Sequence, residues 1–277
     1  GRDYVSGAME NTTAVIHGER AYQTPGQLID ENVQENTIAH EAFHHWFGNL
    51  VTTESWSNLT VNESFANYSE YLWREHKYGK KDADAHLFED VEGYKNGQNF
   101  DKHLVRFKYQ DKEDMFDAVS YNKGGAILHM LRNYLGNDAF YAGLNTYLTD
   151  NKYGTAEAHQ LRLAFEKVSG KDLNWFFNQW YFNSGHPKLI ISYDFNKLRK
   201  TVTVNIVQSQ LNEFQFPFAI DIFENNKRIR HHVFITGNES SFTFPITKQP
   251  DLIQVNADGV LLCDIEENKV LSDYIFQ

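Results

Sequence analysis

The chain has 277 residues and a formal net charge of −11 at neutral pH, with 41% hydrophobic residues. This length allows one large domain or two smaller ones, and the composition is that of a globular protein rather than a disordered one. The acidic balance argues against a nucleic-acid partner, which would need a basic surface. The single cysteine, Cys263, excludes an internal disulfide. No apolar run is long enough to span a membrane.

The pattern of apolar residues over the first two thirds of the chain predicts a helical domain. Residues 1–25 are predicted to be extended chain and loop, and residues 80–110 show no clear pattern. Gly185-His186-Pro187 ends the helical region. Apolar residues at helical spacing predict helices over residues 32–48, 60–79, 121–136, 138–149, 156–168 and 173–181.

Beyond residue 186 the pattern changes to short alternating segments separated by turn residues, which is typical of an antiparallel β-sandwich. We therefore expect an α+β protein, with a mainly helical domain over residues 1–185 and the sandwich over residues 186–277. His231 and His232 are adjacent on a predicted strand and would point to opposite faces, so we interpret them as structural. The predicted strands cover residues 189–193, 202–207, 218–223, 232–235, 242–244 and 252–255.

The helix predicted over residues 32–48 carries a His-Glu-x-x-His motif at His40, Glu41 and His44. Positions i and i+4 share one face of a helix, so both imidazoles can bind the same metal ion. Glu41 lies beside them and can act on a metal-bound water. The motif has few fixed letters, and the alternative interpretation is a pair of half-buried structural histidines.

Zinc requires a third protein ligand and an open fourth position for water, and Glu63 is the candidate. Eighteen residues separate it from His44, enough for a loop and the start of a second helix that faces the first. A ligating histidine usually donates its other N–H to an oxygen. Asn67 and Glu70 could each accept this bond, or could form a solvated helix face. His45 points elsewhere on the helix, so we interpret it as non-ligating.

Two further motifs flank these residues. Gly7-Ala8-Met9-Glu10-Asn11 spells GAMEN near the start, and Tyr121-Asn122-Lys123-Gly124 fits a Tyr-x-Lys-Gly pattern downstream. In this order, with the zinc motif between them, they resemble the aminopeptidase N family of zinc metallopeptidases, which are gluzincins and include the leukotriene hydrolase branch. The resemblance covers essentially the whole chain. It implies a thermolysin-like, mainly helical catalytic domain that hydrolyses the N-terminal residue from peptides with a zinc-activated water.

The resemblance implies a catalytic role for each matched residue. His40, His44 and Glu63 would bind one Zn²⁺ per chain. Glu41 would be the general base that activates the water and later protonates the leaving amine. Tyr121 would donate a hydrogen bond to the oxyanion.

The same resemblance implies how a peptide with a free N-terminus would bind. Glu10 would hold the α-ammonium group, and the backbone of Gly7 and Ala8 would run beside the substrate as an edge strand. Met9 and the segment 106–109 are candidates for the pocket of the first side chain. Lys123 is interpreted as structural rather than catalytic.

The sequence also departs from the family pattern, because members carry a large N-terminal β-domain that supplies a second residue for the α-ammonium group. We expect the chain to be part of a longer parent protein that contains this domain, and to be weakly active or inactive alone. Two other functions stay open. A zinc endopeptidase, or a hydrolase with another substrate, would share the zinc motif without the restriction to the first residue. GAMEN argues against it, and an N-acetylated peptide would discriminate. A scaffold relative would typically lose zinc ligands or the Glu base, whereas all are present here.

Overall fold

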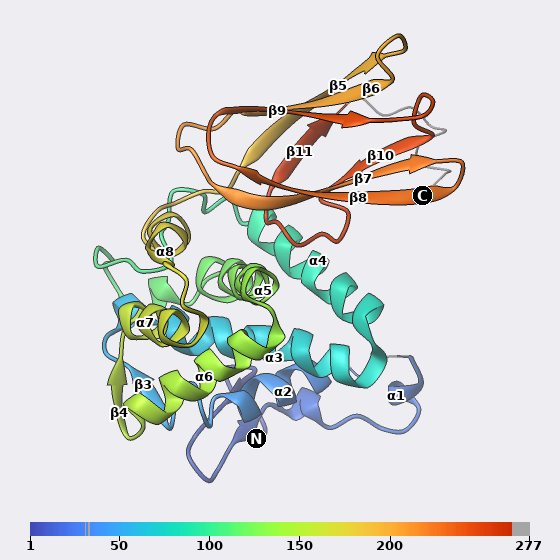
Figure 1. Ribbon diagram of the computed structural model, residues 1–277. Coiled ribbons are helices and arrows are strands. Elements are labelled where there is room, and N and C mark those ends of the chain that lie inside the picture. Colours follow the sequence, from blue (N-terminus) through green and yellow to red (C-terminus); the bar gives the residue numbers. More distant parts are fainter. Residues whose placement is uncertain (31, 33, 268–277) are drawn as a thin grey trace. The chain divides into compact units, whose positions relative to one another are not determined.

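The computed structural model describes residues 1–30, 32 and 34–267. It divides into two compact units, Gly1–Ser184 and Gly185–Gln277. The first is mainly helical and the second is built from strands (Figure 1). The α+β class and the order of the two parts are confirmed, whereas the assignment of residues 1–185 as a zinc peptidase domain stays a prediction. Val33 and residues 268–277, which the predicted helix and sandwich included, lie outside the described residues.

The first unit contains α1 to α8 and two short sheets. Its strands pair β1 (Ala8–Met9) with β2 (Ile16–His17), and β3 (Val51–Thr53) with β4 (Gly154–Ala156). The sequence pattern missed α4, because that helix is polar over most of its surface and buries little more than Ala83, Leu87 and Tyr94. The helices are α1 (Gln27–Asp30), α2 (Glu35–Phe43), α3 (Thr60–Tyr78), α4 (Lys80–Asn96), α5 (Gly124–Leu135), α6 (Asn137–Asn151), α7 (Ala158–Ser169) and α8 (Asn174–Trp180).

Helix α3 is the centre of the helical unit, and α2, α4 and α5 all pack against it. Almost every residue from 60 to 71 is buried. Phe47, in the loop after α2, stacks on Phe65 of α3 at 4.2 Å between ring centroids and on Tyr147 of α6 at 5.9 Å. This aromatic packing fixes the start of α3, where Glu63 lies, relative to α2.

Tyr121 lies in a π-helical turn, Val119–Lys123, that leads directly into α5. Two glycines allow this turn to approach α3 closely. A Cβ atom at Gly124 would stand 1.8 Å from Ser64 Oγ, and one at Gly125 would stand 2.3 Å from Asn67 Oδ1. Ser64 Oγ donates to the carbonyl of Ser120 at 2.6 Å. Backbone contact of this kind is possible only without side chains, and it places Tyr121 above α3.

The described residues of the second unit form two sheets, with strand orders β10-β7-β8 and β11-β5-β6-β9. Burial alternates along β6, as the sequence pattern predicted for a sandwich. β11 runs parallel to β5, so the expectation of a wholly antiparallel sandwich is wrong at this edge. The strands are β5 (Lys188–Asn196), β6 (Thr201–Gln208), β7 (Phe216–Glu224), β8 (Lys227–Ile235), β9 (Glu239–Pro245), β10 (Leu252–Val255) and β11 (Asp264–Glu267).

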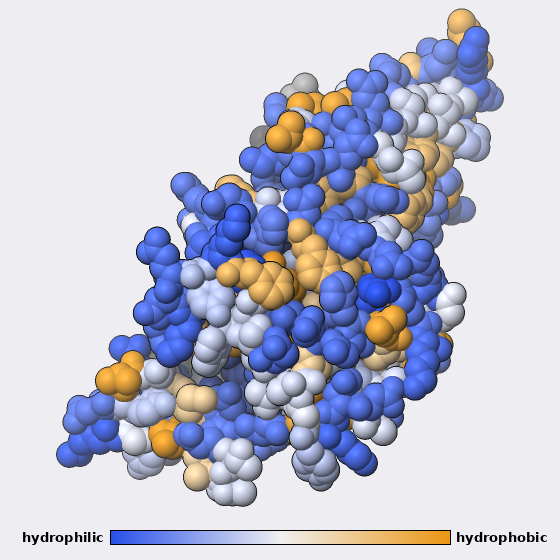
Figure 2. All heavy atoms as spheres, turned by 90° about the vertical axis from the view of Figure 1, so that its left-hand side faces the viewer, coloured by the Kyte–Doolittle hydropathy of each residue, from blue (hydrophilic) through white to orange (hydrophobic). Residues whose placement is uncertain are grey.

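The surface in Figure 2 is mostly hydrophilic, and its hydrophobic residues form small separate groups. Among the residues that the structure describes, no helix combines the length and apolar character needed to cross a bilayer.

Candidate metal centre and active site

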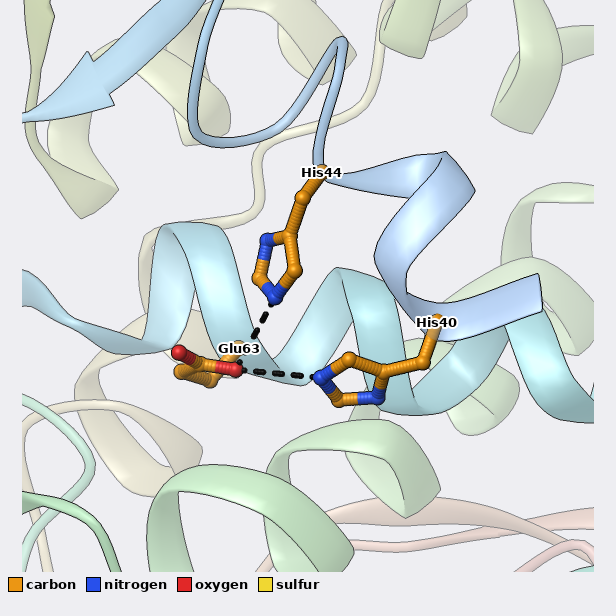
Figure 3. A group of neighbouring side chains, drawn as sticks. All are labelled: His40, His44 and Glu63. Atoms are coloured by element: carbon orange, nitrogen blue, oxygen red, sulfur yellow. Dashed lines mark hydrogen bonds and ion pairs between the residues drawn. The ribbon is translucent and has the colours of Figure 1, made fainter. Parts of the chain in front are cut away.

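The structure brings the three expected ligands together. His40 lies on α2, and His44 follows the last residue of that helix in a helical conformation. The backbone N–H of His44 still donates to the carbonyl of His40, so the i and i+4 arrangement is kept. Glu63 lies in the first turn of α3. Its Oε2 atom is 3.3 Å from the Nε2 atom of each histidine (Figure 3).

These distances fit a zinc ion. One ligand atom from each of the three residues lies within 4.8 Å of the other two. Nitrogen and oxygen ligands at about 2.0–2.2 Å around a tetrahedral zinc stand roughly 3.3 Å apart, which is the observed distance of Glu63 Oε2 from each histidine. Two imidazoles and one carboxylate are also the ligand set of several catalytic zinc sites.

The Nδ1 atom of each histidine is hydrogen-bonded away from the site, which points its Nε2 atom toward Glu63. His40 Nδ1 donates to Glu70 Oε1 at 2.9 Å, and His44 Nδ1 donates to the carbonyl of Phe47 at 2.9 Å. Of the two acceptors that the sequence offered for a histidine, Glu70 contacts His40. Asn67 instead lies against Gly125. The carbonyl of Phe47 is a backbone partner that no side-chain pattern could indicate.

The electrostatics of the site favour a bound cation. Burial by itself would lower the pKa of His40, but its hydrogen bonds to Glu63 and Glu70 raise it to about 10. Burial would raise the pKa of Glu63, but the two histidines bring it down to about 2. Burial raises the pKa of Glu41, and its Oε2 atom has no hydrogen-bond partner among the described residues. A buried polar atom without a partner at such a place is typical of a site that binds something.

A cavity of about 850 Å³ opens over these groups, and the first four residues of GAMEN, from Gly7 to Glu10, line it. A carboxylate oxygen of Glu10 lies within 4.8 Å of ligand atoms of Glu41 and His44. Asn49 Nδ2 donates to the backbone carbonyl of Glu10 at 2.8 Å and holds the segment in place. Met9 also lines the cavity and is 37% exposed. The fold thus brings together two motifs that are about 30 residues apart in the sequence.

Tyr121 reaches the same cavity from the π-helical turn. Its ring lies almost parallel to that of His40, with centroids 5.8 Å apart. Burial and the neighbouring carboxylate of Glu63 raise the pKa of the Tyr121 hydroxyl above its usual value. The hydroxyl therefore stays protonated and can act as a hydrogen-bond donor.

The cavity wall differs from the expected one in one respect. The segment 106–109 is not among the lining residues. Arg106 instead bonds Asp117 and the carbonyl of His103, and Phe107 is 71% exposed. The lining includes Trp56, Leu59, Lys112, Glu113 and Phe116, which lie on loops and short helical turns without a periodic pattern.

Lys123 does not line the cavity, and its ammonium group lies over the ring of Tyr94. His231 stacks on Phe244 inside the second unit, with ring centroids 4.1 Å apart.

The grouping of two histidines with a carboxylate is the arrangement that a metallopeptidase would need. The model of the family described as "Peptidase family M1 domain" matches residues 2–180. The chain belongs to this peptidase family.

Two of the three relatives described next carry aminopeptidase names. The chain is 30% identical over 258 residues to "Tricorn protease-interacting factor F2" of Thermoplasma acidophilum, which covers 87% of this chain and 33% of the relative. It is 30% identical over 229 residues to "Probable aminopeptidase 1" of Saccharolobus solfataricus, covering 79% of this chain and 29% of the relative. It is 33% identical over 192 residues to "Aminopeptidase M1" of Arabidopsis thaliana, covering 67% of this chain and 22% of the relative.

The fold also matches a solved structure, the crystal structure of Legionella pneumophila aminopeptidase A in complex with aspartic acid. The TM-score is 0.78 at 21% sequence identity, and the match covers 98% of this chain and 31% of that one. This likeness supports the fold. The chain spans about a third or less of the length of the relatives described here.

Proposed function

We propose that this chain is the catalytic part of a zinc-dependent aminopeptidase. The observation that carries the proposal is the meeting of five groups in one cavity: the Nε2 atoms of His40 and His44 with the carboxylates of Glu63, Glu41 and Glu10. Zinc would be held by the two histidines and Glu63. When bound there, zinc supplies a Lewis acid that polarises the scissile carbonyl and makes water a stronger nucleophile at neutral pH.

Glu41 and Tyr121 supply the proton chemistry around that centre. Glu41 accepts the proton of the attacking water and passes it to the nitrogen of the leaving amine. Burial raises the pKa of Glu41 toward neutral pH. A carboxyl group whose pKa lies closer to the working pH can both accept and return a proton. The Tyr121 hydroxyl donates a hydrogen bond to the carbonyl oxygen as that oxygen gains negative charge.

The GAMEN segment accounts for cleavage at the first residue. The carboxylate of Glu10 attracts the α-ammonium group of a free N-terminus, and an acylated terminus has no such charge. Among the described strands, β1 pairs only with β2, so its other edge is open beside the cavity. The carbonyl of Gly7 accepts from Gly18 on the β2 side, so the backbone of Ala8 is the part that can bind an extended peptide added as a strand on the open edge. Met9 lines the space beside the first side chain.

The test compares three proteins: this chain, a version extended toward the full length of its relatives, and Glu41→Gln. Metal content is measured by elemental analysis, and hydrolysis with aminoacyl fluorogenic substrates and their N-acetylated counterparts. The proposal expects one zinc per chain and cleavage of free aminoacyl substrates that is lost in Glu41→Gln. Activity confined to the extended version would still support it. Cleavage of N-acetylated substrates would indicate an endopeptidase, and absence of zinc from both versions would overturn the proposal.

A further inference from the structure

Helix α4 carries two titratable residues that the reaction does not use, His86 and Asp90. They lie one turn apart, and their side chains are only 11% and 14% exposed. His86 Nε2 lies 3.9 Å from Asp90 Oδ2. Neither residue lines the cavity. Charged side chains are rarely buried without partners, so the contacts of His86 and Asp90 indicate what the two residues do.

His86 faces the carboxylate that orients a metal ligand. Its Nε2 atom lies 3.3 Å from Glu70 Oε2, within ion-pair distance. The other oxygen, Glu70 Oε1, accepts the hydrogen bond of His40 Nδ1 at 2.9 Å. A carboxylate held by one oxygen can rotate about its terminal torsion, which is broad and soft. The His86 contact is at ion-pair distance and not in hydrogen-bond geometry, and it limits this rotation, so the Glu70 plane and the His40 ring are related to the position of His86.

Asp90 faces the element that carries Tyr121. Its Oδ1 atom accepts a hydrogen bond from Asn122 Nδ2 at 2.8 Å. Asn122 is the residue directly after Tyr121 in the π-helical turn Val119–Lys123. A π turn leaves the regular helical hydrogen-bond pattern, so side-chain anchors such as this one help to decide where its residues point.

We propose that His86 and Asp90 are positioning residues, which tie the orientation of His40 and the placement of Tyr121 to one turn of α4. His86 acts through Glu70, and Asp90 acts through Asn122. This inference rests on the proposed zinc peptidase function and assigns it two residues outside the motifs. A pair that served only to join α4 to α3 would contribute to stability alone.

The test measures zinc affinity and kinetics separately in His86→Gln and Asp90→Asn. Zinc dissociation constants come from competition with a chromogenic chelator, and kcat and KM from aminoacyl substrates on the full-length protein. His86→Gln is expected to weaken zinc binding by up to about 10-fold, because loss of a direct partner of a ligating histidine costs about 10–100-fold and His86 is one contact further out. Asp90→Asn keeps an acceptor oxygen but loses the charge, so the bond from Asn122 is weakened. It is expected to lower kcat at unchanged KM and to leave zinc affinity within about twofold, because Asn122 supports a group that acts in the transition state.

Glu89→Gln is the matched control, since Glu89 lies on the same helix, is exposed and carries the same charge as Asp90. Thermal unfolding of each variant identifies those that fail to fold, and His86→Asn replaces His86→Gln if that variant unfolds. The inference is overturned if both variants match Glu89→Gln in zinc affinity and in kcat, even when their stability falls. Zinc affinity is measured without substrate, so it tests the role of His86 even in a chain without peptidase activity. Normal zinc binding without peptidase activity would contradict the proposed function, and the zinc affinity of His86→Gln would still support or refute the role of His86. A chain that binds no zinc would overturn both.

Discussion

Substitution of Gly124 by alanine should misplace Tyr121 without touching a metal ligand. The added Cβ atom would stand 1.8 Å from Ser64 Oγ and 2.5 Å from Ser64 Cβ. A rotamer change can move the oxygen, but Ser64 Cβ moves only with the backbone of α3. Ordinary contacts are about 3.4–4 Å, so the π-helical turn has to retreat by about 1 Å or more.

The magnitude follows from that displacement. Overpacking of this kind costs about 1–3 kcal/mol, which corresponds to a decrease in Tm of about 2–12 °C for a unit of this size. A displacement of about 1 Å at a catalytic group can reduce the rate about 100-fold. Zinc affinity should change less than kcat, because Glu63 lies beside Ser64 on α3, which α2, α4 and α5 hold in place, whereas the turn that carries Tyr121 is the part that retreats.

The assay compares kcat, KM, zinc affinity and Tm of Gly124→Ala with those of Gly143→Ala. The second variant is a matched control, because its Cβ atom would stand 2.2 Å from a Phe165 ring atom, between α6 and α7. It should lose stability and keep kcat per folded molecule. A double variant, Gly124→Ala with Ser64→Gly, removes both clashing atoms and should recover part of kcat.

The reasoning is refuted if Gly124→Ala keeps its full kcat while Tm falls as in the control. That result would mean that close packing of the turn on α3 supports the fold but does not place Tyr121.

Three further predictions concern single residues. Tyr121→Phe should lower kcat by about 10²–10³ at unchanged zinc content, as measured by steady-state kinetics and metal analysis; an unchanged kcat would exclude the hydroxyl as a donor. Burial lowers the pKa of Lys123 to about 7, so the unfolded chain binds the extra proton between about pH 7 and pH 10. Lys123 therefore makes the free energy of unfolding increase with pH over this range, by up to about 1.4 kcal/mol per pH unit. Urea titrations at several pH values should show a smaller increase in Lys123→Met than in the unmodified chain. Asp221 is 1% exposed and accepts two bonds from Arg230, so calorimetry of Asp221→Asn should show a loss of about 2–3 kcal/mol, with zinc affinity unchanged.

Much of the fold follows from local pattern. The helical periodicity of α3 and α5 and the alternation along β6 reflect which face of each element is buried, and burial is encoded residue by residue. Helix α4 was not predicted, because its buried face is too narrow to produce a clear apolar periodicity among its polar residues. The parallel pairing of β11 with β5 was not predicted either, since strand partners are chosen over long sequence separations.

The sequence by itself determined the chemistry of the candidate site. The spacing of His40, Glu41 and His44 follows from one turn of helix, and Glu63 is the carboxylate at the start of the next predicted helix. Only the tertiary structure decided that Glu70 rather than Asn67 accepts from His40, and that loop residues such as Trp56 and Phe116 form the cavity wall. The reason is physical: a motif fixes neighbours within one helical turn, whereas outer contacts and cavity walls depend on how separate elements pack. That packing is set by close approaches such as Gly124 on Ser64, which no local periodicity encodes.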